Sequence, residues 1–291
     1  MTIHEASQQL RFQLFHIYDE REAGNITDLV MENITGWQKI DRVVNKIAAI
    51  TGKQQQLLEN YTHALLNHTP LQYVLHEAWF YGIKLYVDEN VLIPRPETEE
   101  LVDWVIKEVH SSLFITHREG LHTKKIIDIG TGSGCIPLAI KKSLPSFEVH
   151  SCDISEAALN VAGKNAAYLK LSVPFHLLDI LLEKDRDQLP SFDIIISNPP
   201  YIPQKDKTAM AANVLQYEPH LALFVEDTDP LLFYNAIADF AISHLTKNGI
   251  IYLEIHEEMA QAVMHLYKQK GFANIELKKD LQGRDRMVRV S

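Results

Sequence analysis

The chain has 291 residues, with 28 Lys or Arg against 38 Asp or Glu, so its formal net charge is −10 with histidine neutral. Hydrophobic residues make up 46% of it and charged residues 23%, which excludes a largely disordered, collagen-like or disulfide-stapled chain. At about 100–200 residues per domain, two domains are expected. Basic and acidic residues number 7 and 11 before Ile93 and 21 and 27 from there on. A broad electrostatic surface for nucleic-acid phosphates is therefore not expected.

Cysteine usage and the N-terminal segment bear on the cellular compartment. The two cysteines, Cys135 and Cys152, form no C-x-x-C pair, so neither a disulfide framework nor a thiolate metal site is supported. The segment MTIHEASQQLRF has no basic stretch followed by an apolar core, and no run of 18 or more apolar residues occurs in the chain. We therefore predict a cytoplasmic protein without bound metal, neither exported nor inserted in a membrane.

The first predicted module is helical and covers residues 3–68. Apolar residues recur there at helical spacing, as at 10, 14 and 17 and again at Val43, Ile47 and Ile50, with glycines between the runs. This pattern predicts a bundle of four or five helices. The module contains no catalytic or metal-type cluster, so we assign residues 1–75 to a domain for packing or for docking a partner.

A change of pattern follows the bundle. Residues 79–91, WFYGIKLYVDENV, are rich in β-branched and aromatic side chains, which predicts a short β-hairpin. We expect residues 76–93 to link two domains. After IPRPE, a helix is predicted over residues 98–109, with Thr98 as its N-terminal cap and with an apolar face.

The rest of the chain, residues 94–291, alternates predicted strands and helices. Strands are expected at 125–129, 148–152, 175–178, 193–197, 250–255, 273–277 and 287–290, and helices at 133–143, 156–171, 230–244 and 258–270. This alternation predicts an α/β fold with a parallel, doubly wound sheet. Ligands of such sheets bind beyond the carboxyl ends of the strands, so residues that directly follow strands are the candidates for a site.

A glycine-rich turn follows the first of these strands. In Asp128-Ile-Gly-Thr-Gly-Ser-Gly134 the glycines allow a tight turn and close approach of a ligand to the backbone. The spacing is one residue short of the dinucleotide fingerprint, and no Gly-Lys-Ser/Thr makes it a phosphate-binding P-loop. The next strand ends at Asp153, about 20 residues beyond the first glycine, where a carboxylate accepts ribose hydroxyls. Together these features predict a site for a nucleoside-containing cofactor.

A second cluster, Asn198-Pro199-Pro200-Tyr201, directly follows the strand FDIIIS. The two prolines stiffen the loop and leave nearby carbonyls free, while Asn198 adds an acceptor and Tyr201 an aromatic face. Such a set suits a planar amide or amino group that is held through its two N–H bonds. Acceptors that hold these hydrogens while the nitrogen becomes tetrahedral favour the transition state of methyl transfer over the planar ground state.

These motifs together resemble the class I S-adenosylmethionine-dependent methyltransferases that act on planar nitrogen. Asn-Pro-Pro-Tyr also occurs in adenine-N6 methyltransferases of nucleic acids, so it does not select the substrate. Residues 69–102, TPLQYVLHEAWFYGIKLYVDENVLIPRPETEELV, resemble the signature of the protein-(glutamine-N5) methyltransferases of the HemK/PrmC family. The resemblance implies a Rossmann-like, mostly parallel sheet, S-adenosyl-L-methionine as cofactor, and methylation of the glutamine in the Gly-Gly-Gln loop of class I peptide chain release factors.

The same resemblance implies roles for individual residues. Asp153 is expected to hold the ribose hydroxyls, and Asp179 and Ile180 to lie beside the adenine. The methionine and ribose part of the cofactor is expected to lie against Gly130, Thr131, Gly132, Ser133 and Gly134. Asn198, which also adjoins the cofactor, and the Pro199 carbonyl are expected to bind the substrate amide, with Pro200 and Tyr201 shaping the pocket.

Three further interpretations stay open. One is a nucleic-acid adenine-N6 methyltransferase, which the acidic balance disfavours; another is methylation of a ribosomal-protein glutamine; the last is a binding module without catalysis. Two segments near the site have their own interpretations. Residues 217–219 and 221–224 are interpreted either as a lid over the substrate or as core packing.

The Arg95 and Glu97 region is expected to close over the cofactor, and the protein is expected to be a monomer.

Overall fold

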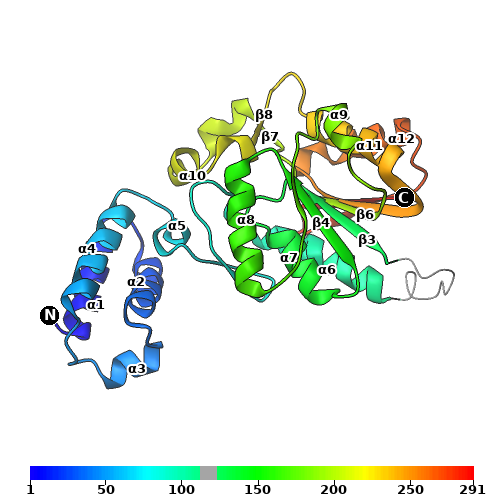
Figure 1. The fold of residues 1–291 in the computed structure, drawn as a ribbon. Coiled ribbons are helices and arrows are strands. Elements are labelled where there is room, and N and C mark those ends of the chain that lie inside the picture. The colour runs from blue at the N-terminus through cyan, green and yellow to red at the C-terminus, as the bar shows by residue number, and fades with distance from the viewer. Residues whose placement is uncertain (112–122) are drawn as a thin grey trace. The chain divides into compact units, whose positions relative to one another are not determined.

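The structure, a computed structural model, describes residues 1–111 and 123–291. By its contacts the chain forms two compact units (Figure 1). The first unit contains Met1–Glu77 together with Ala211–Tyr217, and the second contains Ala78–Met210 together with Glu218–Ser291. Among the described residues, no helix is long and apolar enough to cross a membrane.

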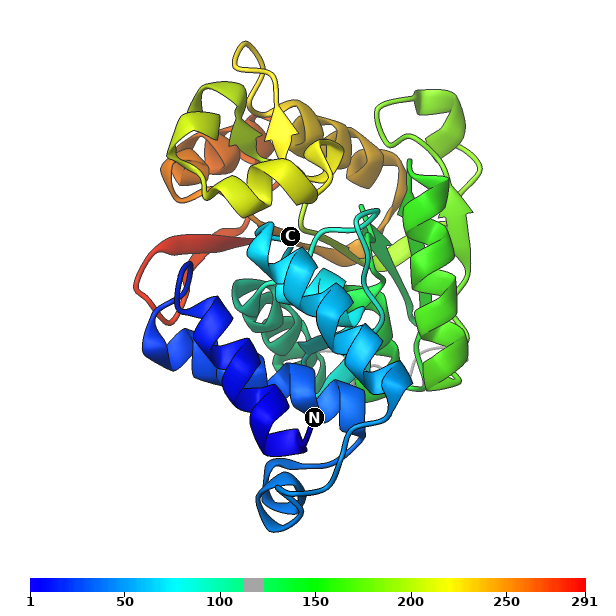
Figure 2. The ribbon, with the colours of Figure 1, turned by 90° about the vertical axis from the view of Figure 1, so that its left-hand side faces the viewer.

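The first unit contains the predicted helical bundle, together with α5 (Leu71–Leu75) and the distant segment α10 (Ala212–Tyr217). The bundle helices are α1 (Ile3–Leu14), α2 (Glu20–Thr35), α3 (Lys39–Val44) and α4 (Gly52–Leu66). Capping boxes at Thr2 and Thr51 begin α1 and α4, and α1, α2 and α4 pack against one another (Figure 2). The Tyr217 hydroxyl donates to the Asn67 carbonyl over 2.6 Å, which ties α10 to the end of α4.

The helical spacing of Val43, Ile47 and Ile50 did not mark one buried face. Helix α3 ends at Val44, one residue after Val43, so Val43 does not share a helix with Ile47 and Ile50. Val43 is 60% exposed and Ile47 is 81% exposed, and only Ile50 is buried.

The predicted hairpin is present and belongs to the second unit. Strands β1 (Ala78–Phe80) and β2 (Ile83–Leu85) pair antiparallel, and the two turn residues, Tyr81 and Gly82, have φ of 45° and 70°. Positive φ at both positions is the geometry of a tight two-residue hairpin. The inward side chains Phe80, Ile83 and Leu85 pack in the core of the second unit.

Helix α6 covers Pro96–His110 and thus begins before the predicted start. Thr98 is not its cap, because Pro96 occupies the first turn and Arg95 is the residue before the helix. The Thr98 side chain is buried and donates to Glu254 instead. A tertiary partner therefore replaced the local capping role that the sequence indicated.

The second unit is built on a seven-stranded sheet in the order β10-β11-β9-β6-β3-β4-β5. Strands β9, β6, β3, β4 and β5 are parallel, and β11 runs antiparallel to both of its neighbours. This is the predicted mostly parallel, Rossmann-like α/β fold. The remaining elements are β3 (Lys125–Ile129), α7 (Cys135–Ser143), β4 (Glu148–Asp153), α8 (Glu156–Leu169), β5 (Phe175–Leu177), α9 (Glu183–Arg186), β6 (Phe192–Ser197), β7 (Ile202–Pro203), a 3-10 turn (Gln204–Ala209), a 3-10 turn (His220–Ala222), β8 (Phe224–Val225), α11 (Leu232–His244), β9 (Leu245–Glu254), a 3-10 turn (Glu257–Met259), α12 (Ala260–Gln269), β10 (Ile275–Lys279) and β11 (Asp285–Val290).

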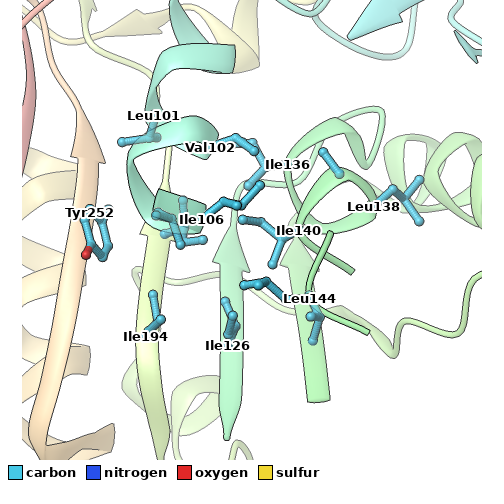
Figure 3. Packing of buried hydrophobic residues seen from close by; sticks show 14 of the residues in the cluster. Leu101, Val102, Ile106, Ile126, Ile136, Leu138, Ile140, Leu144, Ile194 and Tyr252 are labelled. Atoms are coloured by element: carbon cyan, nitrogen blue, oxygen red, sulfur yellow. The ribbon is translucent and has the colours of Figure 1, made fainter. Parts of the chain in front are cut away.

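Alternate residues of each central strand face opposite sides of the sheet. Ile126 and Ile194 pack with α6 and α7, as Figure 3 shows, while Ile127 and Ile195 pack with α11 and α12. A parallel sheet covered on both faces needs continuous apolar runs in its strands. The run of three isoleucines in FDIIIS therefore indicates a central strand. Both faces are closed, so the strand ends are left to form a site.

Candidate active site

The carboxyl ends of β3, β4, β5 and β6 meet at one edge of the sheet, because these strands are parallel and in register. Ile129 pairs with Cys152 on one side and with Ser197 on the other. A cavity opens at this edge. Of the predicted site residues, it is lined by Gly130, Gly132, Asp153, Asp179, Ile180, Asn198, Pro199 and Pro200.

Four of the predicted residues do not line the cavity, namely Thr131, Ser133, Gly134 and Tyr201. Thr131 and Ser133 are buried, and the Thr131 hydroxyl is beside Asp128 under the loop. Tyr201 bonds to Glu254. The glycine loop therefore offers the cavity its backbone rather than its side chains.

The backbone of the loop adopts conformations that only glycine enters easily. Gly130, Gly132 and Gly134 have φ of 79°, 52° and 81°, and a Cβ at Gly130 or Gly132 would meet no atom within 4 Å. At Gly134 a Cβ would lie 3.1 Å from Cβ of Ala162. Gly134 thus allows α8 to pack closely against the loop, while Gly130 and Gly132 leave room for a ligand.

We expect Gly134→Ala to lower the free energy of unfolding by about 2–4 kcal/mol, because left-handed strain adds to overpacking. Gly283→Ala is the matched control, since Gly283 also has a positive φ, 85°, but no atom within 4 Å of an added Cβ. It should lose only about 1–2 kcal/mol. Urea unfolding of both variants measures the difference, and equal losses would contradict the packing role of Gly134.

Asp153 ends β4 and holds the loop in place. Its carboxylate accepts from the N–H of Gly132 and from the N–H of Ser155, each over 2.9 Å. Burial raises the pKa of Asp153, and these backbone donors oppose the rise. Each carboxylate oxygen still has acceptor capacity toward the cavity, which suits two adjacent ribose hydroxyls.

The wall next to Asp153 is apolar. Leu178, Ile180 and Ile154 line it together with Asp179. The Asp179 carboxylate accepts from the Leu181 N–H over 2.9 Å and so fixes the turn after β5. An apolar wall with one carboxylate beside it suits a purine ring with an exocyclic amino group.

A second carboxylate, Asp128, lies fully buried beneath the loop. Burial raises the pKa of Asp128 to about 7; the Asp153 carboxylate adds to the rise, and the Thr131 and Ser151 hydroxyls oppose it. The group therefore takes up a proton on folding in the range below neutral pH.

Asp128→Asn is expected to change the pH dependence of stability. The carboxyl keeps its proton up to about pH 7 when folded but only to about pH 4 when unfolded. Between these two pH values the folded state binds more protons than the unfolded state, so the free energy of unfolding falls as pH rises. Asp128 alone lowers it by on the order of 4 kcal/mol across this window. Urea unfolding at several pH values should show the unmodified protein losing stability relative to Asp128→Asn as pH rises. Parallel curves would contradict the raised pKa.

Two side chains of the loop after β6, Asn198 and Tyr201, are linked by hydrogen bonds through Thr98 of α6 and Glu254 of β9. Nδ2 of Asn198 donates to Oγ1 of Thr98 over 3.0 Å, and Thr98 donates to Oε2 of Glu254 over 2.6 Å. The Tyr201 hydroxyl donates to Oε1 of Glu254 over 3.1 Å. With its amide nitrogen engaged, Asn198 has Oδ1 available as an acceptor at the cavity wall.

The segment after β7 contributes residues both to the cavity lining and to the core. Pro219, Leu221 and Ala222 line the cavity, whereas Phe224 is buried. Glu218 is also buried; it accepts from Arg95 Nη2 over 2.6 Å and from the Ile93 N–H over 3.2 Å. Arg95 and Glu97 lie outside the cavity lining.

Thr98 and Glu254 are the residues of this site that sequence reasoning missed. Glu254 is the last residue of β9, and a polar residue at the carboxyl end of a parallel strand was the signal that could have found it. Within residues 1–111 and 123–291, no group of three or more His, Cys, Asp and Glu side chains is arranged to hold a metal ion.

Comparison with known proteins places this chain among methyltransferases. A model of the methyltransferase small domain matches residues 108–222. A curated protein of Flavobacterium psychrophilum, named release factor glutamine methyltransferase, is 41% identical over 100% of this chain and 99% of its own length. A protein of the same name from Bacteroides thetaiotaomicron is 38% identical over 96% of each chain.

A solved structure supports the fold alone. The delta-N METTL16 MTase domain superposes with a TM-score of 0.52 at 17% identity, covering 72% of this chain and 89% of that chain. At this identity the likeness concerns the arrangement of strands and helices.

Proposed function

Because the chain belongs to the family of release factor glutamine methyltransferases, we propose that it methylates the side-chain amide nitrogen of the glutamine in the Gly-Gly-Gln motif of class I peptide chain release factors. The methyl donor is S-adenosyl-L-methionine. The observation that carries the proposal is the Asn198 carboxamide, which lines the cavity with its nitrogen engaged by Thr98. The Asn198 Oδ1 is then available to accept a hydrogen bond from the planar side-chain amide of the substrate glutamine.

The residues around the cavity fit this cofactor. Gly130 and Gly132 leave space that a Cβ would take, and Asp153 holds a carboxylate at the end of β4, where ribose hydroxyls bind. Leu178, Asp179 and Ile180 supply the slot for the adenine. When bound, S-adenosyl-L-methionine would supply an electrophilic methyl group on its sulfonium, whose C–S bond would break as the N–C bond forms, leaving the neutral thioether S-adenosyl-L-homocysteine.

The chain's own residues then act on the glutamine amide. Asn198 Oδ1 and the Pro199 carbonyl accept its two N–H bonds and hold the nitrogen in line with the methyl carbon. They stabilise the nitrogen as it becomes tetrahedral and positive in the transition state. The methylated nitrogen then releases a proton to water. Burial, with the Glu254 carboxylate adding to it, raises the pKa of Tyr201 far above neutral, so Tyr201 serves as a hydrogen-bond donor and not as a base.

We further propose that residues 1–75 dock the release factor, that residues 76–93 join them to the catalytic domain of residues 94–291, and that the protein acts as a cytoplasmic monomer. The acidic composition favours a protein substrate over a nucleic-acid one.

The test uses methyl-labelled S-adenosyl-L-methionine and purified class I release factor with Gly-Gly-Gln or with Gly-Gly-Ala in its loop. RNA is the third acceptor. Label is expected in the Gly-Gly-Gln protein alone. Equal labelling of both proteins, or labelling of RNA only, would overturn the assignment.

A further inference from the structure

We infer that Thr98 and Glu254 are positioning residues that fix which end of the Asn198 carboxamide faces the substrate. The inference rests on the proposed function, because it explains how Asn198 comes to present an acceptor. Neither Thr98 nor Glu254 lines the cavity; both act through Asn198.

A carboxamide has two ends of nearly equal size, one accepting and one donating. Packing alone therefore selects poorly between an Asn198 that offers oxygen to the cavity and one that offers –NH2. Only the first can bind an amide –NH2, since two facing donors repel. The direction must come from the group that Asn198 meets on its other side, which is the Thr98 hydroxyl at 3.0 Å.

The Thr98 hydroxyl could either donate or accept, and Glu254 decides between the two. An ionised carboxylate only accepts hydrogen bonds, and both of its oxygens are used, one by Thr98 and one by Tyr201. The single Thr98 hydrogen is therefore committed to Glu254. Thr98 Oγ1 is left as an acceptor, so the Asn198 nitrogen turns toward it and the oxygen turns away.

The surroundings keep this direction stable. Thr98 is 2% exposed and Glu254 is 1% exposed, so water does not compete for their bonds. Burial raises the pKa of Glu254 and so acts against the ionised form, whereas the hydrogen bonds from Thr98 and Tyr201 and the Arg286 guanidinium lower the pKa and favour the carboxylate. Bonds to a buried carboxylate are among the stronger ones in proteins.

The placement of Thr98 also fits a polar task. It lies in the first turn of α6 but forms no cap, and its neighbours Leu101 and Val102 belong to the apolar core. A valine would fill the same space without the hydroxyl. The three linked segments are distant in sequence: Asn198 is 100 residues from Thr98, and Glu254 is 156 residues from it.

The test compares Thr98→Val, which has the same shape without the hydroxyl, with Thr98→Ser, which retains it. Thr98→Val is expected to lower kcat for release factor methylation by about 10- to 100-fold. The dissociation constant of S-adenosyl-L-methionine, measured by calorimetry, should stay within about twofold in both variants. Thr98→Ser should recover most of the lost kcat. Full activity of Thr98→Val, or an equal loss of kcat in Thr98→Ser, would overturn the inference.

A second readout does not depend on turnover. In the unmodified protein the side-chain NH2 of Asn198 should exchange slowly with solvent in NMR spectra, because it donates to buried Thr98, and in Thr98→Val it should exchange fast. Equal exchange in both would overturn the inference even if Thr98→Val had lost activity by unfolding in part. Inactivity of the unmodified protein toward every release factor would count against the proposed function, while the exchange rates would still decide the direction of the carboxamide.

Discussion

Asn198→Ala is expected to lower kcat for release factor methylation by about 10²–10³-fold and to leave the affinity for S-adenosyl-L-methionine nearly unchanged. The variant loses the acceptor that lies at the cavity wall. It also loses the hydrogen bond that Asn198 Nδ2 donates to Thr98 Oγ1. The lost interaction strengthens as the substrate nitrogen becomes tetrahedral, so its removal is felt in kcat more than in binding. Steady-state kinetics with purified release factor and calorimetry with the cofactor measure the two quantities.

Asn274→Ala provides the control for this variant. Asn274 is an exposed asparagine before β10, so its replacement should change neither quantity. If Asn198→Ala kept the full kcat, the proposed amide-binding role of the loop after β6 would be wrong.

Asp153→Ala has the second largest expected effect, on cofactor affinity. Loss of two charge-assisted hydrogen bonds to ribose hydroxyls should raise the dissociation constant of S-adenosyl-L-methionine by roughly 10²–10³-fold. The variant also removes the acceptor of the Gly132 and Ser155 N–H groups, so the glycine loop becomes less ordered. Calorimetric titration measures the constant directly.

Asp153→Asn separates the charge from the shape. It keeps the size of the side chain and one acceptor oxygen, and its affinity should lie between those of the unmodified protein and Asp153→Ala. An unchanged dissociation constant in Asp153→Ala, in a protein that unfolds at the usual temperature, would place the ribose elsewhere.

The parts of the fold that the sequence predicted are those with a local signal. The isoleucines of FDIIIS are buried on both faces, as a central parallel strand requires. The glycine turn and Asn198 each directly follow a strand of the sheet, and Asp153 ends one. Strand order then brings these residues together at one edge. Helical spacing likewise indicated the N-terminal bundle, in which Leu10 and Leu14 are buried on α1.

What the sequence did not predict depends on contacts between distant segments. Thr98 has the residue type of a helix cap, but its partner is Glu254, 156 residues away. Thr131 follows a glycine of the turn, yet its side chain is buried, while the neighbouring Gly130 and Gly132 line the cavity. Helix α10 belongs to the first unit, in which Tyr217 bonds to Asn67, 150 residues away. Spacing along the chain carries no information on any of these contacts.

The central claim is that the methyl group goes to a glutamine side-chain nitrogen, and tandem mass spectrometry of the modified release factor tests it most directly. After incubation with the protein and S-adenosyl-L-methionine, the peptide that contains Gly-Gly-Gln should carry one methyl group, located on the glutamine side chain. A methyl group on any other residue of the release factor, or a Gly-Gly-Gln peptide that stays unmodified when methyl transfer from the cofactor has stopped, would contradict the account.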